Sequence, residues 1–567
     1  MNCNSCDFDY LNNIVDYRIA DLFNGMGSLF YGIDDKVLIS NDQDQELADF
    51  FEKISEIDLP IGTKAYDFVC CPPDVIAYYL KDSNNTKKLE YNCSEINGTG
   101  FGGMRNLPKN QLESILDTYK NAAREITDEC KKKSEHPLII VENSGRESAE
   151  RINGKYPISV NSKLIWEKLF IVDKFAQQIC SSGNPCYIDS FDNIAACYFE
   201  DIDLVKSVFY KKKDAYNKEI KNAYTKAIMS MTQHKNKPMV LLGYSRDIME
   251  CCKINNGQEY LFGRRINGFV NDRAAFNLSK KENKTLDYKK THVMNITFEE
   301  GANKLSAFLA REEFHSSTDA KSLPDLAKKR GFIYDACGLD KIYHFKKNEG
   351  GLSFGSNISY NDLDVADYRM RYFRGVTEDD GINGVMRTLT DFKNLGINPL
   401  YKPSGTGQGK GIIGYNPGEL EANFKHRFYE NLDKIKKEFG KGAGYPFLVM
   451  PVLNLAKTDL NEVYDMRFVI YKKINISGRS TIHTIPLIIK KTPKIKKEEY
   501  EENNGFFLTN ITHSVLKTGR PSTDFTIPLC REDSLKKIGI TKDQIKSMCL
   551  YFSVFQSWLL KTKYFRV

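Results

Sequence analysis

The segment NPLYKPSGTGQGKGIIGY, residues 398–415, contains five glycines together with Lys402 and Lys410. Glycine permits positive φ values and a close approach of the backbone, so successive N–H groups can surround an anion, and a lysine adds a charge that binds phosphate oxygens. The segment is not a P-loop, because no GK followed by Ser or Thr opens a helix, and a strand-like run follows it where a dinucleotide-binding fingerprint would have a helix. Two interpretations remain, a mobile glycine hairpin and a loop that binds phosphate.

Apolar runs of strand length follow this segment and predict a β-rich region. In YPFLVMPVLN, residues 445–454, Pro451 cannot donate a backbone hydrogen bond, which leaves neighbouring backbone groups available to a ligand. In YDMRFVIYKK, residues 464–473, Asp465 and Arg467 are two positions apart and therefore share one face of a strand. Either a salt-bridged sheet face or a site for an anion or a metal ion explains these facing charges.

Two further strand ends complete an ordered set of features. TIPLIIKK ends in Lys490 and Lys491, and NNGFFLTNITHS places Asn510 at the end of another apolar run. The order of Lys-Pro, glycine loop, apolar linker strand, Asp-x-Arg, basic strand end and terminal asparagine resembles the ATP-grasp superfamily. The resemblance covers residues 400 to 515 and rests on the ordered set, not on any one motif.

The resemblance implies a role for each of these features. The glycine loop would cover the phosphates of ATP, the preceding lysine would bind phosphate, and the linker strand would hydrogen-bond adenine through its backbone. The implied nucleotide-binding residues are Lys402, Ser404, Gly405, Gly407, Gly409, Lys410, Gly411, Val449 and Met450. Arg467 would contact the transferring phosphate, and Arg467 and Lys490 are the implied catalytic residues.

The resemblance also implies a Mg²⁺ site, at which the sequence departs from the family pattern. Asn510 matches the asparagine of the family's E-x-N motif, but Leu508 stands where the glutamate is expected. Magnesium requires several oxygen ligands, so one amide oxygen is too few. Asp465 is expected to contribute with Asn510, and an acid from residues 498–502 is the alternative.

A second E-x-N occurs far upstream, in LEYNCSEINGTGFGGMRNL, residues 89–107. If Glu95 and Asn97 were the metal ligands, the two halves of the ATP-grasp domain would be circularly permuted. Because Asn510 already closes the series in the ordinary order, we do not expect this permutation. The segment and the later Asn271-Asp272-Arg273 resemble the N-terminal domain of some ATP-grasp-like proteins, which implies that Glu95, Asn97, Arg246 and Arg273 bind a second substrate. Turn glycines and capped strand ends are the structural alternative.

Three apolar runs in the first half of the chain each end in a polar or glycine-containing segment, at residues 137–145, 238–247 and 266–273. Buried strands of an α/β sheet have this pattern, and helical periodicity fills the gaps between them. We therefore expect a mixed α/β and α+β protein. The predicted units are an N-terminal pre-ATP-grasp-like α/β domain (1–275), a connecting helical region with the first part of the ATP-grasp domain (276–390), and an ATP-grasp core with antiparallel sheets and a C-terminal helix (391–567).

Composition favours a packed protein of the cytoplasm. Of the 567 residues, 41% are hydrophobic and 27% charged, and no apolar run reaches the ~18 residues of a membrane span. The apolar stretch at 547–560 is expected to form a packed C-terminal helix. Fourteen irregularly spaced cysteines fit reduced thiols, and a net charge of +7 with interleaved acids predicts neither a nucleic-acid partner nor a membrane partner.

The implied activity is an ATP-dependent ligase that joins a carboxylate to an amine through an acyl-phosphate. ATP and Mg²⁺ are the implied cofactors, and a peptide or protein substrate is inferred from the size of the N-terminal part. The sequence has neither a G-x-S-x-G elbow nor an H-E-x-x-H motif, consistent with chemistry that needs no nucleophilic side chain. The alternatives are a phosphotransferase and a non-catalytic nucleotide-binding module.

Overall fold

The fold is known from a computed structural model. The described residues are 44–81, 87–96, 106–132, 138–140, 194–195, 239–241, 252–261, 264–265, 269–271, 282, 284, 292–294, 310–311, 313–340, 345–348, 351–354, 371–372, 382–383, 385–386, 389–390, 399–404, 411–415, 418–439, 444–475, 478–492 and 525–562.

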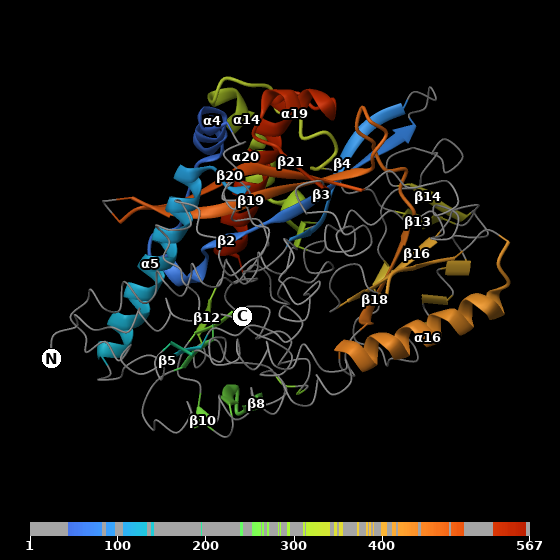
Figure 1. The fold of residues 1–567 in the computed structure, drawn as a ribbon, viewed down its shortest axis with the longest axis horizontal. Coiled ribbons are helices and arrows are strands. Elements are labelled where there is room, and N and C mark those ends of the chain that lie inside the picture. The colour runs from blue at the N-terminus through green and yellow to red at the C-terminus, as the bar shows by residue number, and fades with distance from the viewer. Residues whose placement is uncertain are drawn as a thin grey trace, which may run out of the picture.

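The largest sheet joins segments from the two ends of the chain (Figure 1). Its central strands lie in the order β1 (Ile57–Asp58), β20 (Ser480–Lys491), β19 (Tyr464–Ile474), β3 (Pro73–Lys81) and β4 (Lys87–Ile96), with β2 (Cys70–Cys71) against β19 and β21 (Thr526–Pro528) against β20. All neighbours are antiparallel. The first and third of the predicted units therefore contribute strands to one sheet.

Three helices pack on this sheet: α4 (Gln45–Ser55), α5 (Lys109–Lys132) and α20 (Lys542–Lys561). Helices α13 (Thr318–Lys321) and α14 (Leu323–Lys329) pack against α20, and the 3-10 helix η2 (Ala65–Asp67) packs against α5. Helix α19 (Glu532–Lys537) precedes α20. A single cluster of buried side chains includes Phe51 of α4, Ile115 of α5, Phe468 of β19 and Phe552 of α20. The rings of Phe468 and Phe552 lie 5.5 Å apart, which places α20 against the face of β19 that carries Phe468.

The C-terminal helix α20 confirms the predicted packed helix. A capping box starts it, in which the N–H of Gln544 donates to Thr541 Oγ1 (3.2 Å) and the N–H of Thr541 donates to Gln544 Oε1 (2.9 Å). All residues from Ser547 to Leu560 are buried, so the helix is enclosed on every side and needs no polar face. Within the described part of the chain, no helix combines the length and apolar character that a membrane span needs.

A second antiparallel sheet has the strand order β15 (Arg371–Tyr372), β18 (Gly444–Pro451), β16 (Pro399–Ser404) and β17 (Ile413–Gly414), and it confirms the β-rich pattern predicted around the glycine segment. Helix α16 (Glu421–Phe439) packs on it through aromatic rings, with Phe428 against Tyr401 at 4.8 Å and Phe424 against Tyr415 at 4.5 Å. In Figure 1 this sheet and α16 lie to the lower right of β3 and β19.

The three apolar runs predicted as buried strands are neighbours in a parallel sheet. Its order is β12 (His292–Met294), β11 (Phe269–Asn271), β7 (Met239–Leu241), β5 (Leu138–Ile140) and β6 (Ile194–Ala195). The remaining described strands are β8 (Cys252–Asn255), β9 (Gln258–Leu261) and β10 (Arg264–Arg265) in one small sheet, and the hairpin of β13 (Phe345–Asn348) and β14 (Gly351–Phe354). Helices, antiparallel sheets and a parallel sheet thus coexist, as the mixed fold class requires.

Lys472 of β19 is fully buried, and its ammonium group donates to the carbonyl of Lys64. Burial lowers the pKa of Lys472 to about 8, although Asp67 and Glu125 partly oppose this shift. Because the unfolded chain holds this proton more tightly, its contribution makes the free energy of unfolding increase with pH between about 8 and 10.5.

We expect Lys472→Met to remove this dependence. Between pH 7 and pH 10, the free energy of unfolding of the wild type should rise by about 2 kcal/mol relative to that of the variant. Urea denaturation at the two pH values measures the free energy of unfolding of each protein. Lys53→Met, at an exposed position of α4, is the control and should keep the pH dependence of the wild type. Parallel behaviour of wild type and Lys472→Met would contradict the prediction.

Candidate functional site

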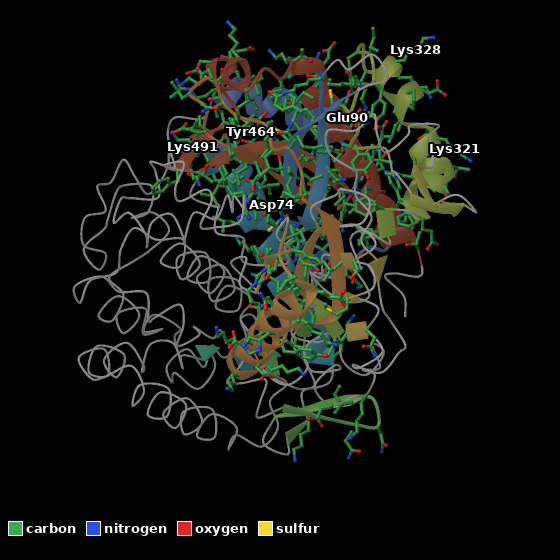
Figure 2. All side chains as sticks on the ribbon, turned by 90° about the vertical axis from the view of Figure 1, so that its right-hand side faces the viewer. Asp74, Glu90, Lys321, Lys328, Tyr464 and Lys491 are labelled. Atoms are coloured by element: carbon green, nitrogen blue, oxygen red, sulfur yellow. The ribbon has the colours of Figure 1, made fainter. Side chains whose placement is uncertain are left out.

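Four charged side chains from three adjacent strands meet on one face of the largest sheet. Asp465 and Arg467 of β19 share this face, as their spacing predicts. The antiparallel register places Lys490 of β20 opposite Asp465 and Asp74 of β3 opposite Arg467. In Figure 2, Asp74 lies on the side of this sheet nearer to the orange strands β16 and β18. We call Asp74, Asp465, Arg467 and Lys490 the charged cluster.

Ion pairs connect all four members of the charged cluster. The guanidinium of Arg467 binds Asp74 at two points, with Nε 2.7 Å from Oδ1 and Nη2 2.7 Å from Oδ2. The Nζ of Lys490 lies 3.1 Å from Oδ2 of Asp74 and 3.1 Å from Oδ1 of Asp465. Two carboxylates and two cations therefore balance each other, and the ammonium of Lys490 is shared by both acids.

Burial makes this balance necessary. The exposed fraction of the side chain is 3% for Asp74, 9% for Lys490 and 13% for Arg467, and an unpaired charge at such a depth is strongly unfavourable. Burial alone raises the pKa of Asp74, but the charges of Arg467 and Lys490 and their hydrogen bonds outweigh it. The pKa of Asp74 therefore lies well below its usual value, and the carboxyl group is ionised at neutral pH.

The structure brings together the two predicted catalytic residues, Arg467 and Lys490, and the predicted metal ligand Asp465. Of the two interpretations of Asp465 and Arg467, the salt-bridged sheet face describes the observed contacts. Each of these residues pairs across to a neighbouring strand, Asp465 to Lys490 and Arg467 to Asp74. An anion or metal site at the same place remains a proposal.

Asp74 is the member of the cluster that the sequence analysis missed. It lies 393 residues from Arg467 along the chain, so no local spacing relates the two. The available signal was an acid that follows Pro72 and Pro73 directly before the apolar run VIAYYL. An ionisable residue at the start of a buried strand requires a partner, and here the partner comes from the other end of the chain.

Glu95 lies one strand further across the same sheet. It belongs to β4, and its Cα is the register partner of Asp74. Arg467, Asp74 and Glu95 thus occupy one row across β19, β3 and β4, in which neighbouring strands are ~4.8 Å apart. Asn97 follows the end of β4 by one residue and lies outside the described residues. The upstream E-x-N motif therefore begins in the sheet that holds Arg467.

Two described carboxylates of the charged cluster, Asp74 and Asp465, are oxygen donors of the kind that Mg²⁺ prefers. Both contact the ammonium of Lys490 at 3.1 Å. Asp74 is also the register partner of Glu95. Within the described ranges, no three His, Cys, Asp or Glu side chains form a metal-binding group.

The two ends of the glycine segment lie in the second sheet. Lys402 is half-buried on β16, and β16 pairs with β17, Tyr401 being opposite Ile413. Gly411, with a φ of +79°, is held by helix α16, since Asn431 Nδ2 donates to its carbonyl at 2.7 Å. A Cβ atom at Gly411 would collide with the side chain of Ile435, so this glycine is required by its backbone conformation and by its packing.

The linker strand β18 lies between β16 and β15, and Val449 is in register with both Tyr401 and Arg371. Met450 pairs with Leu400 on the β16 side. After β18 the chain passes to the large sheet, where the N–H of Tyr79 donates to the carbonyl of Asn454 at 2.9 Å. This segment therefore connects the strands of the glycine segment to the sheet of the charged cluster.

The remaining predicted site residues are only partly described. Arg246 and Arg273 follow the neighbouring parallel strands β7 and β11, whose carboxyl ends lie at one edge of their sheet. For Ser404, Val449, Met450 and Glu95 the structure describes the backbone position. Gly405, Gly407, Gly409, Lys410, Asn97, Arg246, Arg273 and Asn510 lie outside the described residues.

The chain matches no model of a known protein family and no curated protein sequence.

Asp74→Asn is expected to lower the free energy of unfolding by about 3 kcal/mol at pH 7, because two buried cations lose an ionised partner. Because the pKa of Asp74 is lowered in the fold, its contribution is complete above pH ~4 and decreases as the pH falls below that value. Urea denaturation at pH 7 and pH 3 should show a smaller difference between wild type and variant at the lower pH.

The control is Glu532→Gln, which removes the exposed pair of Glu532 with Lys542 and should change the free energy of unfolding by less than ~1 kcal/mol. Equal effects of the two substitutions at pH 7 would contradict a buried, coupled role for Asp74.

Proposed function

We propose that the protein is an ATP-dependent ligase of the ATP-grasp type, which joins a carboxylate to an amine and releases ADP and phosphate. The observation that carries the proposal is that Arg467 and Lys490 lie together on a buried sheet face. Residues 452–454 link that sheet directly to the strand next to Lys402 and the glycine segment. The strand of Lys402, the linker strand, the Asp-x-Arg strand and the strand that ends in Lys490 thus lie in two sheets that residues 452–454 connect.

The proposed reaction has two steps. A carboxylate oxygen of the substrate forms a bond to the γ-phosphorus of ATP as the bond to ADP breaks, which gives an acyl-phosphate. The amine nitrogen then attacks the acyl carbon, phosphate leaves with the electrons of its bond, and the amine releases a proton. Positioning and charge neutralisation provide most of the rate enhancement in such phosphoryl transfers.

The residues of this chain fit those tasks. Arg467 and Lys490 would neutralise charge on the transferring phosphate, for which preorganised cations in a water-poor site are effective. Lys402 and the N–H groups of the glycine segment would hold the other phosphates. Arg246 and Arg273, which follow neighbouring parallel strands, remain the candidates for binding a carboxylate substrate such as a peptide.

Asp465 and Asn510 remain the proposed Mg²⁺ ligands. Asp74 and Asp465 both contact Lys490 at 3.1 Å, so these contacts do not favour one carboxylate over the other. Ligands from the E-x-N segment, which begins at Glu95 beside Asp74 in register, are the alternative and correspond to the circularly permuted order. When bound, Mg²⁺ would supply charge neutralisation at the phosphates.

One observation favours a second candidate, the non-catalytic nucleotide-binding module. The charged cluster is balanced without any ligand, since each cation already contacts a carboxylate. A balanced cluster can have a purely structural role. A phosphotransferase on the same fold is the other alternative, and it differs from the ligase only in the acceptor.

The ligase predicts release of ADP and phosphate from Mg²⁺-ATP in the presence of a pool of amino acids and peptides. Arg467→Ala should lower this release by about 100-fold, because it removes a cation that acts on the transferring phosphate. Lys402→Ala should also weaken ATP binding. Lys491→Ala is the matched control. Lys491 follows Lys490 on β20 but pairs with Glu462 (3.2 Å), so the Lys491→Ala variant should release ADP and phosphate as fast as the wild type.

The products distinguish the candidates. Phosphate release that requires both a carboxylate and an amine supports the ligase, whereas a phosphorylated product that persists with amine present supports the phosphotransferase. ATP binding without turnover supports the module. No binding of ATP to the folded wild type would contradict all three.

A further inference from the structure

Strand β20 contains a β-bulge beside the charged cluster. Phe468 of β19 pairs with Pro486, but the adjacent Arg467 pairs with Ile488, so Leu487 is an extra residue in β20. An inserted residue of this kind shifts the alternation of side chains along the rest of the strand by one position. The residues of β20 that follow the bulge therefore lie on the opposite face from the one that uninterrupted alternation would give them.

This bulge decides which face of the sheet carries Lys490. With the bulge, Lys490 is opposite Asp465, and its ammonium contacts the carboxylates of Asp465 and Asp74, each at 3.1 Å. If β20 continued in its earlier register, Lys490 would be opposite Tyr464, whose side chain lies on the other face. Tyr464 is only 1% exposed, so an ammonium at that position would be buried away from both acids.

Residues 529–530 hold the bulge from the other side of β20. In a regular strand, the carbonyls of successive residues point toward opposite neighbours. Here the carbonyl of Pro486 accepts from the thiol of Cys530 and the carbonyl of Leu487 accepts from the N–H of Leu529, both at 3.0 Å. Burial raises the pKa of Cys530 well above its usual value, so the thiol keeps the proton that it donates. One segment thus binds two consecutive carbonyls, as the bulge requires.

A second bulge borders the charged cluster on its other side, in β4. There Ser94 is an extra residue between the partners of Val75 and Asp74. The buried guanidinium of Arg311 donates to the preceding carbonyl, that of Cys93, at 3.1 Å. Bulges are concentrated next to active sites, where they redirect side chains. The alternation of the sheet is therefore interrupted on both sides of the cluster.

We propose that the bulge at Leu487 positions Lys490 for the proposed reaction, and that Cys530 is a positioning residue because it holds this bulge. The inference rests on the proposed function, in which Lys490 acts on the transferring phosphate, and it adds residues that do not contact a substrate. Cys530 is fully buried, so it acts through the backbone of β20. A displacement of a catalytic group by about 1 Å can lower a rate by about 100-fold.

Turnover of Mg²⁺-ATP separates positioning from stability. Cys530→Ala removes the donor at the bulge and should lower kcat by about tenfold, while KM for ATP stays within about twofold of the wild-type value. Cys530→Ser keeps a donor there and should retain at least about half of the wild-type kcat. Cys549→Ala, which truncates a buried cysteine of α20, is the matched control and should leave kcat unchanged.

A double-mutant cycle in urea denaturation tests the same link without turnover. Cys530→Ala should lower the folding equilibrium constant by about tenfold in the wild type but by about threefold in the Lys490→Met background, where no ammonium needs to be positioned. Cys549→Ala is again the control, and its effect should be the same in both backgrounds.

Equal effects of Cys530→Ala in the two backgrounds, or an unchanged kcat in the folded Cys530→Ala variant, would overturn the positioning inference and leave the proposed ligase intact. Absence of ATP turnover in the wild type would count against the proposed function. In that case the cycle in urea would still decide whether Cys530 positions Lys490.

Discussion

The bidentate ion pair of Asp74 with Arg467 holds together strands β3 and β19 in the middle of the largest sheet. It connects two strands that are 393 residues apart in the chain and fixes their register in a seven-stranded sheet. Because both groups are nearly buried, neither is tolerated in this position without the other. The pair therefore requires the segment around β3 and β4 to fold together with the segment around β19 and β20. The core that contains Phe51, Phe468 and Phe552 also joins segments from these distant parts of the chain.

The same constraint determines what the site can do. The sheet that holds Arg467 and Lys490 also contains Glu95 on β4, and residues 452–454 lead to this sheet from β18. The residues proposed to act on phosphate thus come from segments that are distant in sequence. The charges of Arg467 and Lys490 are compensated by carboxylates from β3 and β19.

The sequence predicted the features that depend on local pattern. The apolar runs around Ile139, Val240 and Val270 became adjacent parallel strands, and the stretch 547–560 became the buried helix α20, because each element is encoded by its own periodicity. The shared face of Asp465 and Arg467 also followed from spacing alone. Asp74 was missed because its partner is set by antiparallel register between the chain ends, which no local pattern contains. Similarly, the need for glycine at position 411 comes from contacts with α16, although the glycine pattern itself was visible.

The most direct test of the central claim is a crystal structure with Mg²⁺ and a non-hydrolysable ATP analogue. We expect the terminal phosphate to contact Arg467 and Lys490 and the glycine segment to cover the phosphates. A nucleotide bound away from the charged cluster would show that the cluster is not the site of phosphoryl transfer.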